Sequence, residues 1–421
     1  MKACASCQRL FPDEGAYCPV DGQRLQSVAE APVPAHPDDP RVGKAFCGGR
    51  YQIRRIVADG GMGRVYQALD LKDNRGVALK ILHREVALDE IALQRFRREF
   101  EVSSSLPHDH IVEVFAFERT EDKSYALVME YLEGEELRAL LKREKVMAPD
   151  RVIRMVSQIA LGLAAAHDRK VVHRDLKPDN IFLVGSRDGD LIKILDFGSI
   201  RDNSEGAKKL TAIGTTIGSP FYMSPEQAQG LPSLDHRADV WSLGSIVYEC
   251  LTGTVPFRGS TGPSILLAIL SDEPTPPSVA GHAHKAPRSL DPVLLRALAK
   301  SVDDRIATAA DLADRLGEAY GLEGDHRAWA RIPHDELQAR IAEGLPRALV
   351  RHDEATAARE LPSPPAALAD DPFRAGSHGG PTAFTEEVVM GVPDPTPRWL
   401  VPTIAGTAVL VGILVAFLIA R

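Results

Sequence analysis

The chain has 421 residues, of which 44% are hydrophobic and 26% are charged, with a formal net charge of −8. These proportions are ordinary for a globular protein, and the length allows two or three domains or one large domain with tails. The net negative charge gives no reason to expect nucleic-acid binding, and five cysteines in so long a chain do not indicate a disulfide scaffold.

Residues 1–27 are predicted to form a small zinc-binding unit, and they lack the apolar stretch of a signal peptide. The candidate ligands are Cys4, Cys7, Cys18 and Asp21. Two pairs at this spacing resemble a zinc ribbon in which a carboxylate replaces the usual fourth cysteine, as zinc permits. His36 or Cys47 would be other choices for the fourth ligand, and free thiols on a disordered tip are the alternative to a metal site.

A large α+β domain is predicted between residues 45 and 322. Residues 28–44 precede it and are rich in Pro, Ala and Asp, which indicates a stiff linker. Strand-like alternation comes first within the domain, and apolar residues at helical spacing come later. We expect one helix to begin with Asp150 as its N-cap and another to end at Gly253. Strands followed by helices predict a two-lobed α+β fold.

The C-terminal part of the chain is predicted to be a linker followed by a membrane span. Residues 323–398 are rich in Pro, Ala and acidic residues, which favours a flexible segment, although residues 335–350 would form a helix. Residues 399–420 contain no charge over 22 positions. As a helix they would extend about 33 Å, enough to cross a hydrocarbon core of ~30 Å. A buried core helix is the weaker alternative, since no polar face is visible.

Three features within the large domain indicate phosphate chemistry. Glycines at 60, 61 and 63 lie between two strand-like runs, where they form either a plain hairpin turn or a loop whose backbone approaches phosphates. Lys80 lies in an apolar strand, where it points to water or pairs with Glu99 and a phosphate. Asp196 follows another apolar strand, where it belongs to a turn or binds Mg²⁺ together with substrate phosphate.

Seven motifs occur in one order along residues 46–316: GGMGRVY, VALK, RREF, HRDLKPDN, DFG, SPE and DVWSLG. In this order and spacing they resemble a Hanks-type serine/threonine protein kinase of the bacterial kind. The resemblance implies the two-lobed kinase fold, with a strand-rich N-lobe and a mainly helical C-lobe. It also implies transfer of the γ-phosphoryl group of ATP to Ser and Thr hydroxyls of proteins.

The resemblance also assigns roles to individual residues. Asp175 would take the proton of the substrate hydroxyl, and Lys177 would reach the γ-phosphate. Asn180 and Asp196 would hold Mg²⁺, for which Mn²⁺ would substitute. The implied ATP-binding residues are Val57, Gly60, Gly61, Gly63, Val65, Lys80, Glu99, Glu130 and Leu132. The implied structural residues are Glu226, Asp239 and Arg305, of which the first and last would form a buried ion pair, and His173 would support the catalytic loop.

The sequence departs from the family pattern at a few positions. The first glycine of the family's loop is replaced by Ala58, which is followed by Asp59, and the substrate-facing threonine is replaced by Ser219. Arg174 precedes the catalytic aspartate, an arrangement that in the family accompanies phosphorylation of the activation loop. The candidate phosphosites are Thr211, Thr215 and Thr216, with solvated loop threonines as the alternative.

Taken together, these features predict a membrane-tethered serine/threonine kinase with its catalytic domain in the cytoplasm, at the plasma or inner membrane. ATP, protein substrates and the membrane would be its partners, and a homodimer would serve autophosphorylation in trans. A pseudokinase scaffold is the main alternative, and the complete set of Lys80, Asp175, Asn180 and Asp196 argues against it. A zinc-ribbon nucleic-acid binder is a third, disfavoured by the few basic residues of the ribbon.

Overall fold

The computed structural model describes residues 39–186, 189–197, 220–280 and 286–360, together with short fragments among the first 27 residues. Contacts divide the chain into two units, residues 1–361 and 362–421, and the described residues belong to the first. Three two-residue strands near the N-terminus form a sheet in the order β2-β1-β3. They are β1 (Lys2–Ala3), β2 (Leu10–Phe11) and β3 (Gln26–Ser27).

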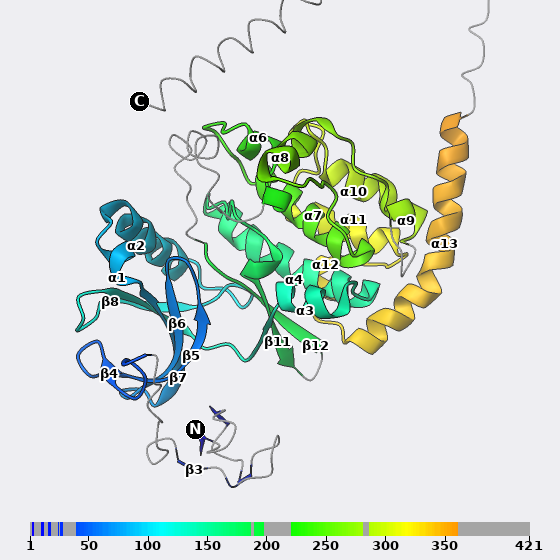
Figure 1. Ribbon diagram of the computed structural model, residues 1–421. Helices are drawn as coiled ribbons and strands as arrows, with labels where there is room; N and C mark the ends of the chain where they lie inside the picture. The colour runs from blue at the N-terminus through cyan, green and yellow to red at the C-terminus, as the bar shows by residue number, and fades with distance from the viewer. Residues whose placement is uncertain are drawn as a thin grey trace, which may run out of the picture. The chain divides into compact units, whose positions relative to one another are not determined.

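The N-lobe is an antiparallel sheet with one long helix packed on it (Figure 1). In sheet order the strands are β4 (Ala45–Phe46), β5 (Tyr51–Asp59), β6 (Gly63–Asp70), β7 (Arg75–Leu82), β9 (Tyr125–Glu130) and β8 (Val114–Arg119). Helix α2 (Glu90–Ser104) follows the short α1 (Arg84–Ala87) and begins where the Asp89 side chain accepts two backbone N–H groups. It packs on β8 through Phe96, whose ring lies edge-on to that of Phe117.

The C-lobe is mainly helical and begins with a small sheet of order β10-β11-β12 near the junction of the lobes (Figure 1). These strands are β10 (Gly134–Glu136), β11 (Ile181–Ser186) and β12 (Gly189–Ile194). The α-helices are α3 (Leu137–Glu144), α4 (Pro149–Asp168), α6 (Pro225–Ala228), α7 (Arg237–Thr252), α8 (Gly262–Ser271), α9 (Pro277–Ala280), α10 (Asp291–Ala297), α11 (Ala309–Ala319), α12 (His326–Trp329) and α13 (His334–Glu360). Single 3₁₀ turns are η1 (Pro178–Asn180), η2 (Pro220–Tyr222) and η3 (Arg288–Leu290).

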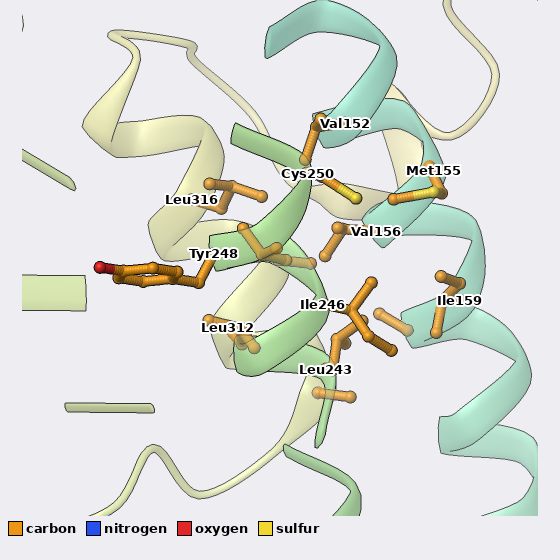
Figure 2. Close-up of a cluster of buried hydrophobic side chains, with 14 of the residues drawn as sticks. Val152, Met155, Val156, Ile159, Leu243, Ile246, Tyr248, Cys250, Leu312 and Leu316 are labelled. Carbon is orange, nitrogen blue, oxygen red and sulfur yellow. The ribbon is translucent and has the colours of Figure 1, made fainter. Parts of the chain in front are cut away.

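The core of the C-lobe lies among α4, α7 and α11, whose apolar faces meet (Figure 2). Val156 and Ile159 from α4, Ile246 from α7 and Leu312 from α11 are fully buried there. Burial of side chains of this size contributes about 1.5–3 kcal/mol each. Most of α7 is thereby buried between α4, which precedes the catalytic loop in the chain, and α11.

The ends of the two central helices were predicted with mixed success. Gly253 ends α7 as predicted, with a left-handed φ of 76° and its N–H bonded to the carbonyl of Glu249. The prediction of Asp150 as an N-cap is wrong, because α4 begins at Pro149 and Ala148 is the capping residue. Proline is favoured at the first helical position, where no N–H donor is needed, so the helix starts two residues earlier than predicted.

The folded body extends beyond residues 45–322 at both ends. Asp39 and Val42 are buried, although residues 28–44 were predicted to be a linker. Helices α12 and α13 pack against α4, and Trp329 is fully buried. The prediction of a flexible segment is therefore wrong for residues 323–360, whereas the helix predicted within residues 335–350 is confirmed and is longer than predicted.

Within the described part of the chain, no helix is long and apolar enough to cross a membrane. The predicted span, residues 399–420, lies outside the described residues.

Candidate active site

The catalytic loop between α4 and β11 is anchored by a buried carboxylate on α7. Asp239 accepts hydrogen bonds from the backbone N–H groups of His173 and Arg174, both at 2.8 Å, and from Nε2 of His167 at 2.8 Å. Burial alone would raise the pKa of Asp239, but these hydrogen bonds hold it below its usual value. The predicted structural role of Asp239 thus corresponds to a fixed anion that ties the loop to the C-lobe core.

His173 supports the same loop with its ring. Its Nε2 donates to the carbonyl of Leu195 (2.8 Å), and its Nδ1 accepts from the N–H of Asp175 (3.3 Å). One nitrogen donates and the other accepts, so the arrangement corresponds to a neutral imidazole. The ring also packs edge-on against Phe197, with centroids 4.8 Å apart. His173 therefore links the loop that carries Asp175 to the segment that carries Asp196, as a support and not as a base.

Three predicted catalytic residues meet on this loop. Lys177 Nζ lies 2.7 Å from Oδ2 of Asp175. The amide nitrogen of Asn180 donates to the backbone carbonyl of Asp175 at 2.8 Å. The side chains of Asp175 and Lys177 are both partly exposed, so a substrate hydroxyl and a phosphate can reach them. The geometry fits a carboxylate base beside a cation, the pair that the resemblance implies.

A lysine from the N-lobe bridges two carboxylates across the lobes. Lys80 of β7 lies 2.8 Å from Glu99 of α2 and 3.1 Å from Asp196, which follows β12. Burial raises the pKa of Glu99 to about 7, and the charge of Asp196 adds to the shift while Lys80 opposes it. The predicted pairing of Lys80 with Glu99 is confirmed as a contact. Asp196 joins it from a backbone with φ of +57°, a left-handed conformation that is uncommon outside glycine.

The residues predicted to hold Mg²⁺ offer the oxygen atoms that this ion prefers. Asn180 uses its amide nitrogen for Asp175, so its amide oxygen is the atom available to a metal. The carboxylate of Asp196 is 39% exposed and contacts Lys80, and the N–H of the preceding Leu195 donates to the backbone carbonyl of Asn180 at 2.9 Å. One amide oxygen and one carboxylate, with substrate phosphate, form a chemically suitable magnesium site.

The predicted ATP-binding residues lie on the strands and connections around Lys80. Val65 is directly opposite Lys80 in the β6–β7 ladder, and Val57 lies on β5 before the glycine-rich loop. The N–H of Gly60 donates to the carbonyl of Gly63 (3.0 Å) and closes the loop. Gly61 is exposed within this loop.

Two further predicted ATP-binding residues lie where the N-lobe sheet ends. Glu130 is the last residue of β9, and Leu132 follows it. The carboxylate of Glu130 is occupied, since it accepts from Lys193 at 2.6 Å and from the N–H of Glu113 at 2.8 Å. The backbone of residues 130–132 is therefore the group that would contact the adenine of ATP.

Two other groups of charged residues lie within the C-lobe. The predicted ion pair of Glu226 and Arg305 is confirmed, with two contacts of 2.8 and 3.0 Å and an Arg305 side chain that is fully buried. A second group was not predicted. Arg138 of α3 contacts Asp179 and Glu249 at 3.3 and 3.1 Å, together with the hydroxyl of Tyr222. An arginine in an amphipathic helix gives no sequence signal of such contacts.

Several predicted residues lie outside the described part of the chain. They are Cys4, Cys7, Cys18, Asp21, His36, Thr211, Thr215, Thr216 and Ser219. Among the described residues, no group of three or more metal-binding side chains is present. Cys47, considered as a fourth zinc ligand, is described, and burial raises the pKa of its thiol to about 12, which disfavours the thiolate that zinc binds.

Comparison with known proteins agrees with this geometry. The family model of the protein kinase domain matches residues 51–312. The serine/threonine-protein kinase pkn3 of Myxococcus xanthus is 38% identical over 274 residues, which cover 64% of this chain and 50% of that one. PrkC of Bacillus subtilis is 36% identical over 315 residues, which cover 72% of this chain and 47% of that one.

PknB of Mycobacterium tuberculosis is 37% identical over 277 residues, which cover 65% of this chain and 43% of that one. The chain thus spans about half or less of the length of these relatives. The crystal structure of the M. tuberculosis PknI kinase domain matches with a TM-score of 0.52 and 28% identity, over 66% of this chain and 98% of that one. The chain belongs to the protein kinase domain family, and its kinase domain is of the bacterial Hanks type.

Proposed function

We propose that this chain is a serine/threonine protein kinase that transfers the γ-phosphoryl group of ATP to Ser and Thr hydroxyls of proteins. The observation that carries the proposal is the convergence of two groups of charged residues. Lys80, Glu99 and Asp196 join the lobes, and Asp175 with its neighbours forms the catalytic loop beside them. Both groups are needed to position ATP against a hydroxyl.

Each residue of the site has a separate role in phosphoryl transfer. The substrate oxygen bonds to the γ-phosphorus while the bond to the bridging oxygen breaks, ADP leaves, and the hydroxyl proton goes to Asp175. Lys177, 2.7 Å from that carboxylate, stabilises charge on the transferred group. Asn180 and Asp196 would hold Mg²⁺, whose charge would offset that of the phosphates. Lys80 orients the nucleotide and is itself oriented by Glu99.

A pseudokinase scaffold is the rival function, and the contacts among the four central residues do not favour it. Radiolabel transfer from ATP by the full chain distinguishes the two. We expect Asp175→Asn to lower the transfer rate about 10²- to 10⁴-fold, because the general base is lost. Binding of Mg²⁺–ADP should persist. Asp303→Asn, a matched change at a side chain that is 93% exposed, should transfer like wild type. Equal labelling by wild type and Asp175→Asn would contradict the proposed mechanism.

We propose further that phosphorylation on Thr211, Thr215 or Thr216 controls this activity, with one copy of the chain phosphorylating another. Support comes from Arg174, which lies beside the catalytic aspartate and whose backbone carbonyl is held by Gln227 of α6 at 2.7 Å. A phosphate near an arginine forms charge-assisted hydrogen bonds that can order a loop. Phosphosite mapping after incubation with ATP checks this, and an unmodified loop in active protein would contradict it.

We also propose a membrane-tethered layout. Residues 1–27 would bind zinc, residues 399–420 would span the plasma or inner membrane once, and the kinase domain would remain in the cytoplasm, where ATP is available. The support is the spacing of Cys4, Cys7 and Cys18 and the absence of charge over the 22 residues from 399 to 420. Metal analysis of wild type against Cys7→Ser, with Cys250→Ser as control, checks the zinc. Membrane fractionation of the full chain checks the tether.

A further inference from the structure

The glycine-rich loop is held from its outer side by charged residues. Asp59, which follows the Ala58 that replaces the family's first glycine, is the last residue of β5 before the loop. Arg64, just after the loop, donates to the carboxylate of Asp59 from both Nε (2.8 Å) and Nη2. His83 at the end of β7 donates from Nε2 to the carbonyl of Gly60 (2.8 Å) and lies 3.3 Å from Asp59. The loop thus has side-chain supports that do not involve a nucleotide.

Arg64 extends beyond the loop to a buried carboxylate. Its Nη1 lies 2.7 Å from Oδ2 of Asp39, whose side chain is only 5% exposed. Asp39 also accepts from the hydroxyl of Tyr66 (2.6 Å) and from the N–H of Arg41 (3.0 Å). Burial opposes ionisation of Asp39, yet these hydrogen bonds hold its pKa below the usual value. Asp39 is therefore an anionic anchor, and Arg64 connects it to Asp59.

The segment that carries Asp39 is itself fixed to the N-lobe. We call residues 39–49 the N-terminal strap. Arg41 donates to Asp122 in the β8–β9 turn at 2.9 Å. The N–H groups of Cys47 and Gly48 donate to the carboxylate of Glu121 in the same turn, at 3.0 and 2.8 Å. The strap is thus bonded to the β8–β9 turn at two places, and Asp39, the acceptor for Arg64, belongs to it.

We propose that Arg64 is a positioning residue that transmits the fixed position of the N-terminal strap to the glycine-rich loop and so sets nucleotide affinity. A loop that binds phosphates through its backbone binds well only when it is in the competent position. Apparent affinity falls in proportion to the fraction of molecules in that position. Releasing Asp59 from Arg64 lowers this fraction without touching the catalytic loop. The inference rests on the proposed function, because the nucleotide in question is that of the kinase site.

The test uses the full chain and measures the Kd of a fluorescent ADP analogue with Mg²⁺, together with KM for ATP and kcat. We expect Arg64→Met to raise Kd and KM about three- to tenfold, the range of a partly buried, charge-assisted contact, with kcat changed less than about twofold. Arg64→Lys keeps the positive charge but loses the guanidinium group that reaches two carboxylates at once. Its Kd and KM should therefore lie between those of wild type and Arg64→Met. Asp39→Asn should raise Kd in the wild-type background. In the Arg64→Met background it should raise Kd little further, since both substitutions break the same contact between Asp39 and Arg64.

Two further variants keep the test decisive. Asp59→Asn cuts only the exposed end of the link and should reproduce Arg64→Met even if the latter folds poorly. Asp73→Asn, an exposed carboxylate that contacts Arg50, is the matched control and should leave Kd unchanged. An unchanged Kd in Arg64→Met and Asp59→Asn, or additive losses in the double variant, would overturn the inference. Wild type that binds nucleotide without transferring phosphate would contradict the proposed function alone.

Discussion

At the scale of single residues, Lys80 serves two carboxylates at once. The carboxylates of Glu99 and Asp196 lie at hydrogen-bonding distance from the Lys80 ammonium, at 2.8 and 3.1 Å. With both carboxylates ionised, the cluster has two negative charges and one positive charge. Glu99 is the more deeply buried of the two side chains, and the excess negative charge disfavours its ionised form most. Its protonation should therefore depend on pH near neutrality.

The pKa of Glu99, raised from 4.5 to about 7, gives a prediction with a definite sign. Because the folded-state pKa is raised, the contribution of Glu99 to stability is fully present below pH 4.5 and is lost as the pH rises through 7. A neutral glutamine resembles the protonated acid. The free energy of unfolding of Glu99→Gln minus that of wild type, measured by denaturant titration, should therefore increase as the pH rises from 4.5 to 7. A difference that does not change with pH would contradict the shift.

Sequence alone could predict the contact of Lys80 with Glu99, because both belong to motifs of fixed order. It could not predict the link from Asp39 through Arg64 to Asp59. Asp39 lies in a stretch whose Pro- and Asp-rich composition predicts a linker, and nothing local shows that its carboxylate is buried. Contacts of this kind depend on where the chain folds back, which composition does not encode.

At the scale of elements, the β5–β6 hairpin explains why two neighbouring glycines are not equivalent. A Cβ built on Gly63 would lie 2.4 Å from the backbone carbonyl oxygen of Ile81 on β7. A Cβ on Gly61 would have no atom within 4 Å. The close approach of β6 to β7 at Gly63 thus leaves no room for a side chain, whereas the loop tip is open.

We expect Gly63→Ala to destabilise the protein by about 1–3 kcal/mol, since a rigid backbone atom must move. Gly61→Ala, the matched change two residues away, should alter stability by less than about 0.5 kcal/mol. Thermal unfolding of both variants in the absence of nucleotide makes the comparison. Equal melting temperatures for the two variants would show that the β6–β7 contact is looser than described.

Most of the strands and the long helices could be predicted from hydrophobic periodicity, because one face of each is buried in the lobe. Their ends were less predictable. For α4, the sequence predicted Asp150 as the N-cap, yet the helix begins at Pro149, because the fixed φ of proline suits the first helical position. Arg174 and Asp196 both have positive φ, which the residue type of Arg174 does not indicate and which aspartate adopts in only a minority of cases.

At the scale of the whole molecule, two C-terminal helices complete the C-lobe. Trp329 of α12 is fully buried, and its ring lies so close to Gly317 of α11 that a Cβ there would be 2.2 Å from it. Its indole N–H donates to the carbonyl of Glu323 at 3.1 Å. Leu337 and Ile341 of α13 extend the same buried surface. These residues join the core around α4 and α11 and are not an appended tail.

Trp329→Ala should lower the free energy of unfolding by about 3–5 kcal/mol, the cost of removing a buried aromatic side chain. Val350→Ala, on α13 but 57% exposed, should change it by less than about 0.5 kcal/mol. Denaturant titration of each full-length variant measures both values. A loss at Trp329 no larger than that at Val350 would show that α12 does not belong to the cooperative core. The Pro-rich composition further along the chain obscured this in the sequence.

The N-terminal strap and α12 have a practical consequence for anyone who expresses this kinase domain alone. The family model matches from residue 51 to residue 312, which falls within α11. A recombinant fragment cut at those limits would lack Asp39, leave Arg64 and Tyr66 without their shared acceptor, and sever the helix that faces Trp329. The limits of the family model and the limits of the packed structure differ here, and a fragment of residues 39–360 would keep these contacts.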